Sequence, residues 1–133
     1  MSALKLVLLD YTGSTQIAGV HSFVGEDASG SFGILPGHAR FVTVLVAGLA
    51  RFRTGTEWTY LAVPGAALYF LDDVLTLGTR RYFVDADYSR ITRSLERQLR
   101  AEEQSLRELR ESLRLMEEQM QKRLWELARA ERG

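Results

Sequence analysis

The chain contains no cysteine, and only two prolines and two histidines occur among its 133 residues. Without cysteine it has no disulfides, no thiolate metal ligands and no cysteine nucleophile, which suits a reducing compartment. The histidines, His21 and His38, stand far apart in sequence, whereas a zinc site usually needs three or four ligands at motif spacing. We therefore expect no metal or other cofactor.

Long apolar runs and an excess of charge are also absent. The longest apolar stretches reach about half of the roughly 20 residues that a membrane-spanning helix needs, so no span is expected. No basic region precedes an apolar core and a small-residue cleavage site, so no secretory signal is expected. The 17 basic and 17 acidic residues cancel, and this balance gives no indication of a nucleic-acid partner.

The sequence lacks catalytic signatures as well. Neither histidine accompanies a nucleophile motif such as GxSxG. The loop from Gly25 to Gly30 lacks the lysine of a phosphate-binding loop and does not open a helix. The adjacent carboxylates Asp72 and Asp73 are typical of a turn between strands. We therefore expect that the chain is not an enzyme.

The first two thirds and the last third of the sequence differ in composition. Residues 1–88 hold six basic and eight acidic residues, whereas residues 89–133 hold eleven basic and nine acidic ones. The first part is rich in glycine and β-branched residues, and the second in helix formers. The chain is therefore predicted to form a β-sandwich domain over 1–86 and a helical region over 87–133.

The first part has the period of short strands. Turn signals such as Pro36-Gly37 and Pro64-Gly65 separate apolar runs every eight to twelve residues, which favours an antiparallel sandwich or barrel over a parallel sheet. The edges of so small a sandwich need covering, so a docking partner is expected. The predicted strands are Leu4–Leu9, Ile17–Val24, Ser31–Leu35, Phe41–Val46, Leu49–Arg53, Glu57–Val63, Ala66–Leu71 and Val74–Leu77.

The second part is predicted to be helical from Tyr88, with Asp87 as its N-cap. Neither glycine nor proline occurs from there to Arg132. One helix of this length would extend roughly 67 Å at 1.5 Å per residue, too long to be buried on a small head. The polar stretch 101–105 leaves two alternatives open, one long helix or a two-helix hairpin. The helix must pack on another chain, fold back or self-associate as a coiled coil.

Apolar residues recur along this helix at intervals of three and four. They predict a partner interface made of Leu106, Leu109, Leu113, Met116, Met120, Leu124 and Leu127.

The most unusual local segment is Gly30-Ser31-Phe32-Gly33-Ile34-Leu35-Pro36-Gly37-His38-Ala39. Glycine and proline at this density fix backbone dihedrals, while Phe32, Ile34 and Leu35 supply apolar contact. The segment is interpreted either as a rigid docking loop with an exposed aromatic residue or as a strand with two tight turns.

This segment resembles the signature of the epsilon subunit of F-type ATP synthases. The strand at Phe41–Leu45, the glycine turn at Gly48 and the helix entry at Asp87 follow in the expected order. The resemblance implies about ten strands in an antiparallel sandwich, followed by a C-terminal helical region.

The resemblance also implies a function. Such a subunit sits at the foot of the central stalk and binds gamma and the polar loops of the c-ring, so that ring rotation reaches the catalytic head. The tail can extend along gamma and alpha/beta and restrain ATP hydrolysis. It implies a proton- or sodium-translocating complex, with this subunit peripheral to the cytoplasmic face of the bacterial inner membrane. Ser31, Phe32, His38 and Arg40 become the expected ring contacts.

The sequence departs from the family pattern at several positions. Ser31 replaces an acidic residue and Arg40 a proline. Asp87 and Arg90 keep the spacing of the ATP-binding motif found in some members, but the flanking residues differ, which argues against nucleotide binding. The tail resembles the variant, often sodium-linked, bacterial enzymes. The alternative function is a β-sandwich scaffold that oligomerises through a coiled-coil helix.

Overall fold

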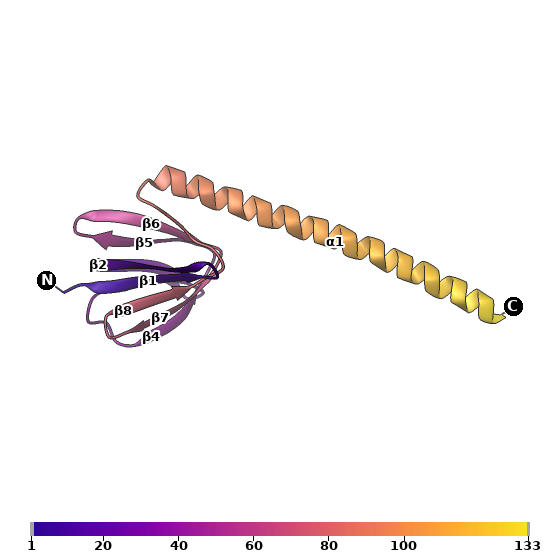
Figure 1. The fold of residues 1–133 in the computed structure, drawn as a ribbon, viewed down its shortest axis with the longest axis horizontal. Coiled ribbons are helices and arrows are strands. Elements are labelled where there is room, and N and C mark those ends of the chain that lie inside the picture. The colour runs from indigo at the N-terminus through magenta and orange to yellow at the C-terminus, as the bar shows by residue number, and fades with distance from the viewer. Residues whose placement is uncertain (1, 133) are drawn as a thin grey trace. The chain divides into compact units, whose positions relative to one another are not determined.

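The computed structural model describes residues 2–132, which cluster into two compact units, one reaching to Arg97 and the other starting at Gln98. Strands make up most of the first unit, and one helix crosses from it into the second (Figure 1). The elements are β1 Leu4–Asp10, β2 Gly13–Asp27, β3 Gly30–Ile34, β4 Phe41–Leu45, β5 Gly48–Thr54, β6 Glu57–Val63, β7 Ala66–Leu71, β8 Val74–Gly78, β9 Phe83–Asp85 and α1 Tyr88–Arg132.

The strands form a β-sandwich with two layers. One layer has the order β1-β8-β7-β4, and the other has β9, β6 and β5 beside β2, which also pairs with β3. The β1–β2 pairing joins the layers at one edge, and the single residue pair Asp27–Leu45 joins β2 to β4. Within residues 2–132, β3 and β9 alone pair with a single strand, so few strand edges remain open for pairing with other chains.

Strand β2 belongs to both layers because its path is interrupted near Gly19. Leu6 of β1 faces Ile17, but Leu4 faces Val20, so β2 has one extra residue at this point. Gly19 has a φ of 70° there, a left-handed conformation that costs glycine little. The resulting bulge lets one 15-residue strand pair with β1 and then continue beside β5.

The core lies between the two layers and is entirely apolar. Phe23 and Phe70 are the largest side chains that are fully buried. Alternation along β7, where Ala66, Leu68 and Phe70 point inward, places three residues of one strand in this core. The other buried members of the cluster are Leu4, Leu6, Leu8, Val20, Ile34, Leu45, Ala50, Phe52, Leu61, Val63, Leu75 and Leu77.

The predicted fold class is confirmed, with two differences in detail. Nine strands are found in residues 2–132 where the resemblance implied about ten. The pairing of β1 with β8 is parallel, so the sandwich is not wholly antiparallel. Strand β9, which was not predicted from its three residues, pairs with β6 immediately before the helix.

The helix α1 is continuous, so the hairpin alternative is wrong. Residues 101–105 are helical, because none of them breaks a helix. The predicted N-cap is confirmed: the Arg90 amide donates to Asp87 Oδ1 at 3.1 Å, and the Ile91 amide donates to the Asp87 carbonyl at 3.1 Å. Ile91 is buried and Tyr88 meets Tyr60 edge-on at 5.3 Å, so the first helical turns belong to the first unit.

Candidate partner-binding surfaces

Ser31 and Phe32 lie on β3, so the strand interpretation of this segment is the one observed. Their side chains point to opposite faces of the sheet, as successive strand residues do. Ser31 is exposed opposite Glu26 of β2. Phe32 is half-buried, packs against the core and meets Phe41 at a ring distance of 5.3 Å. Phe32 is therefore not the fully exposed aromatic residue of the docking-loop interpretation.

His38 and Arg40 lie beyond β3, in the loop that leads to β4. Both are exposed. The His38 ring stands edge-on to Phe41 and Phe70, at 5.7 and 5.9 Å between centroids. The Arg40 guanidinium carbon lies 6.0 Å from the centre of the Tyr69 ring, within reach of a cation–π contact. These two residues therefore share one region with the end of β7.

The Pro36-Gly37 turn is held to the hairpin between β7 and β8. The Gly37 amide donates to Asp73 Oδ1 at 2.7 Å, and the His38 amide donates to the Leu35 carbonyl at 3.1 Å. Asp72 and Asp73 have φ of 50° and 59°, as a tight two-residue hairpin turn requires. The turn expected from these two carboxylates is confirmed, and Asp73 also anchors the neighbouring loop.

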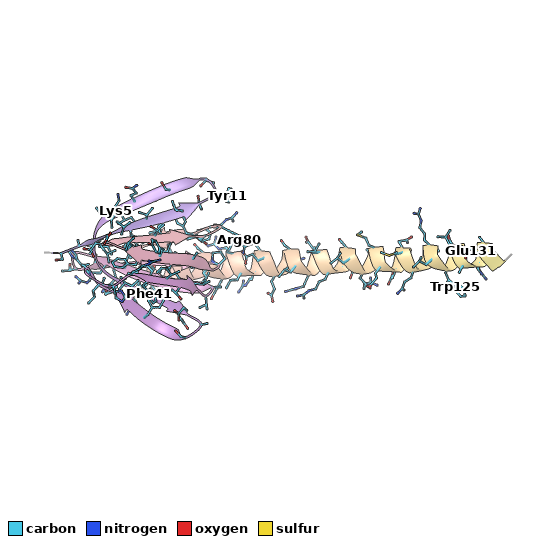
Figure 2. All side chains as sticks on the ribbon, turned by 90° about the horizontal axis from the view of Figure 1, so that it is seen from below. Lys5, Tyr11, Phe41, Arg80, Trp125 and Glu131 are labelled. Atoms are coloured by element: carbon cyan, nitrogen blue, oxygen red, sulfur yellow. The ribbon has the colours of Figure 1, made fainter. Side chains whose placement is uncertain are left out.

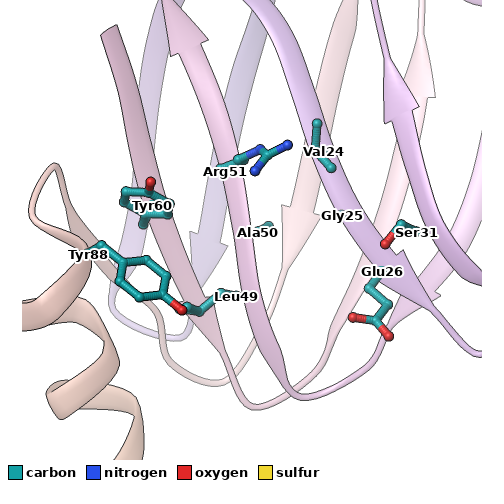
Figure 3. A pocket seen from close by; sticks show the side chains of 9 residues that line it. All are labelled: Val24, Gly25, Glu26, Ser31, Leu49, Ala50, Arg51, Tyr60 and Tyr88. Atoms are coloured by element: carbon teal, nitrogen blue, oxygen red, sulfur yellow. The ribbon is translucent and has the colours of Figure 1, made fainter.

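A shallow cavity of about 280 Å³ opens on the outer side of β2, β3, β5 and β6 (Figure 3). Ser31 and Glu26 lie on one side of it, and Tyr60 and Tyr88 on the other. The Arg51 guanidinium stacks on Trp58 at 4.9 Å. Ser31 therefore belongs to this face, away from His38 and Arg40, and the four expected ring contacts do not form one cluster.

One exposed apolar surface of the sandwich was not predicted. It is the outer face of the β4-β7-β8-β1 layer, where neighbouring strands pair Val42 with Tyr69 and Leu71 with Val74. Val42 and Val44 are 64% and 67% exposed. Exposed apolar residues on neighbouring strands make this face a candidate for protein contact. We call it the outer sheet face.

The seven predicted residues of the helical interface are all exposed. Figure 2 shows side chains standing out from the ribbon along the whole helix, with Trp125 and Glu131 labelled near its end. Within the second unit no apolar side chain of the described residues is buried. Ion pairs support the helix itself, with Arg114 bound to Glu111 and Glu118, and Arg107 at 3.5 Å from Glu103. The apolar stripe is therefore uncovered.

The two residues that match the nucleotide motif bind to each other and to Asp85. Arg90 Nη2 lies 3.0 Å from Asp85 Oδ1 and its Nε lies 3.9 Å from Asp87 Oδ2. The Asp87 amide and then the Arg90 side chain lower the pKa of Asp85, since hydrogen bonds favour the charged form. This network stabilises the start of the helix.

A second carboxylate network joins β2 to β4. Thr43 Oγ1 donates to Asp27 Oδ2 at 2.8 Å, and the Ser29 amide donates to Asp27 Oδ1 at 2.9 Å. The hydroxyl of Ser29, then that of Thr43, lowers the pKa of Asp27 below its ordinary value of 3.8. Asp27 thereby ties the hairpin loop to the strand where the two layers meet.

Across residues 2–132 no helix is long and apolar enough to cross a membrane.

The sandwich and the helix thus each expose an apolar surface of the kind through which proteins bind other proteins. The family model for the ATP synthase delta/epsilon chain, β-sandwich domain, matches residues 4–83. The chain belongs to this family. The resemblance to the epsilon subunit drawn from residues 30–39 is confirmed.

Two curated relatives extend the comparison. The chain is 38% identical over 85 residues to ATP synthase epsilon chain 2 of Cereibacter sphaeroides, covering 62% of this chain and 58% of that protein. It is 69% identical over 32 residues to ATP synthase epsilon chain 2 of Paraburkholderia xenovorans, covering 24% and 22%. The chain thus spans less than two thirds of the length of these relatives.

Solved structures share the fold. A chain of the Euglena gracilis mitochondrial ATP synthase, resolved with OSCP, F1 and c-ring, matches with a TM-score of 0.59 and 19% identity, covering 73% of this chain and 64% of that one. A chain of the Tetrahymena thermophila mitochondrial ATP synthase central stalk and c-ring matches with a TM-score of 0.51 and 13% identity, covering 62% and 69%. At these identities the likeness concerns the fold alone.

Proposed function

We propose that this chain is a non-catalytic central-stalk subunit of an F-type ATP synthase that couples rotation of the c-ring to the catalytic head. The observation that carries the proposal is the family match over residues 4–83, combined with the uncovered outer sheet face. A rigid sandwich that exposes Val42 and Val44 beside Tyr69 needs a protein partner more than a substrate.

In this proposal the domains keep their predicted bounds, with 1–86 binding gamma and the c-ring and 87–133 forming the regulatory tail. The outer sheet face binds gamma, because its apolar area suits a permanent interface. The polar loop with His38 and Arg40, and Ser31 on the other face, are the ring contacts. The complex translocates protons or sodium ions, and the subunit is peripheral to the cytoplasmic face of the inner membrane.

The outer sheet face gives the sharpest test. Val44→Glu places a charge in the centre of the proposed gamma interface, where burying it without a partner is costly. The matched control Thr56→Glu adds the same charge at an exposed turn between β5 and β6. Tagged wild-type chain and Thr56→Glu should recover gamma and c-ring from gently solubilised membranes, and Val44→Glu should not. Recovery of neither subunit by the wild type contradicts the proposal.

The tail requires its own test, and the structure sets where to cut. Because Ile91 is buried within the first unit, a chain that ends at Arg97 keeps the helix start that a cut after Asp87 removes. ATP hydrolysis by the assembled enzyme should rise when 98–133 are deleted. Unchanged hydrolysis would show that this tail does not restrain the enzyme, and would leave the coupling role intact.

A further inference from the structure

The exposed stripe of α1 continues a heptad pattern whose two interruptions have opposite charge. With Leu106 and Leu113 at a positions and Leu109 and Met116 at d positions, the pattern extends from Leu99 to Leu127, about four heptads, enough for a stable coiled coil. Two d positions in this range are charged. They are Glu102 near the beginning and Arg123 near the end.

The apolar side chains of this stripe are exposed along the helix. Leu99, Leu106 and Leu113 are between 41% and 54% exposed, as residues on a lone helix are. Glu102 accepts a hydrogen bond from Gln98 Nε2 at 3.3 Å, which orients its carboxylate along the helix surface. We propose that two copies of this chain associate through residues 99–130 as an antiparallel coiled coil.

The register follows from the rule that an a position of one antiparallel helix packs opposite a d position of the other. One alignment places three apolar layers in the seam, each of them occurring twice by two-fold symmetry. Its layers pair Leu113 with Met116, Leu109 with Met120, and Leu99 with Ala130 of the second copy.

The same alignment brings the two interruptions together. Arg123 of the second copy faces Leu106, and the next layer pairs Glu102 with Leu127 of the second copy. Glu102 and Arg123 are therefore one helical turn apart across the seam, within reach of their long side chains. In the dimer, each Glu102 therefore lies near the oppositely charged Arg123 of the second copy.

The flanking positions agree with this register. Arg110 and Glu117 occupy e positions, and e positions face each other in an antiparallel pair, so each Arg110 lies beside Glu117 of the second copy. Shifting the helices by one heptad in one direction opposes Arg110 to Arg110. Shifting them in the other direction opposes Glu117 to Glu117. Both shifts are disfavoured by like charge.

A parallel dimer is disfavoured for the same reason. In parallel helices d positions meet d positions, which would place Glu102 against Glu102 and Arg123 against Arg123 inside the seam. A like pair buried in this way has no compensating partner. The charges thus select a second copy in the antiparallel orientation. The dimer forms from this chain alone, so the experiments that test it do not depend on the proposed stalk function.

The first test is charge exchange in the full-length chain, followed by sedimentation equilibrium. The wild type should form dimers, and Glu102→Arg should raise the dissociation constant roughly tenfold or more, because it opposes Arg123. Arg123→Glu should do the same, and the double variant Glu102→Arg/Arg123→Glu should return to within about threefold of wild type. Circular dichroism checks that each variant stays helical.

A charge-reversal control and a cross-linking test of the helix orientation complete the experiment. Glu108→Arg changes the same charge at an outer c position and should leave the dissociation constant unchanged. The chain has no cysteine, so a chain with Leu109→Cys mixed with a chain carrying Met120→Cys should form a mixed disulfide when dissolved oxygen is supplied as the oxidant. Cross-linking of Leu109→Cys with itself indicates a parallel dimer and overturns the proposal. A wild type that stays monomeric at about 100 μM, or a double variant that does not recover, overturns it as well.

Discussion

The sandwich and the helix handle their apolar residues in opposite ways. In the sandwich, sixteen core side chains are at most 5% exposed, whereas in the second unit the large apolar side chains between Leu99 and Leu127 are all at least 41% exposed. The sandwich is therefore stabilised by its own burial. The helix depends on propensity and on ion pairs around Arg114, which support an isolated helix only weakly. One region buries its own apolar residues, and the other leaves them exposed.

The largest expected difference between the two regions is in the free energy of unfolding that is lost when one large side chain is removed from each. Phe70→Ala should lower the free energy of unfolding of the sandwich by about 3–5 kcal/mol, because Phe70 is fully buried. Leu113→Ala, measured on dilute monomeric chain, should change it by less than about 0.5 kcal/mol. Urea titration followed by tryptophan fluorescence measures both. Similar losses would show that the helix is packed against something in the free chain.

If Phe70→Ala does not fold, Ile34→Val provides a milder version of the same test. Ile34 is fully buried, and loss of one methyl group there should cost about 0.5–1.5 kcal/mol.

A second test addresses how tightly the sandwich is packed. A Cβ at Gly25 would lie 3.0 Å from both Leu45 and Phe23 side-chain atoms and 3.1 Å from Phe32. Gly25→Ala should therefore destabilise the chain by about 1–3 kcal/mol. Gly33→Ala is the control, because its nearest neighbour is at 3.7 Å. Equal urea midpoints for the two variants would show that the side chains around Gly25 shift to make room for the added methyl group.

The difference between the regions also explains what the sequence could predict. Strand period and turn residues located eight of the nine strands, and Asp87 located the helix start, because these signals are local. Strand β9 was missed because three residues hold too little periodicity, and its pairing with β6 depends on distant chain. The parallel β1–β8 pair was missed for the same reason.

The binding surfaces were harder to predict than the strands. The helical stripe was visible as spacing, since a helix repeats its face every 3.6 residues. The outer sheet face was not recognised, because apolar residues on both faces of β7, as in Ala-Leu-Tyr-Phe-Leu, look like those of a buried strand. Two interpretations of the segment around Phe32 stayed open in the sequence, because only the pairing of β3 with β2, which depends on distant chain, turns this side chain inward.

A smaller effect is expected at the junction between the regions. Asp87→Ala removes the cap from the Arg90 amide and should cost about 1 kcal/mol of helix stability, while Asp87→Ser keeps an acceptor and should cost less. Hydrogen exchange of the Arg90 and Ile91 amides measures local opening. Faster exchange confined to the first turns would show that the junction opens independently. Faster exchange along the whole helix would show that its stability depends on the cap.

The smallest expected effect is a pH dependence that belongs to the sandwich alone. Hydrogen bonds from Ser29 and Thr43 hold the pKa of Asp27 below 3.8. A group whose folded pKa is depressed contributes stability that is present above the unfolded pKa and is lost as pH falls through the folded pKa. The wild-type urea midpoint should thus fall as pH drops below about 4, with part of the decrease due to Asp27.

Thr43→Val separates this contribution from those of the other carboxylates. It removes one donor to Asp27 while keeping a β-branched side chain suited to β4. At pH 7 the variant should be less stable than the wild type, and the gap should narrow towards pH 3, because protonated Asp27 no longer benefits from the lost hydrogen bond. A constant gap would assign the loss to packing. The helical content of residues 98–132 should not follow this titration, since Asp27 belongs to the other unit, and a helix signal that changed in step with it would show that the two regions unfold together.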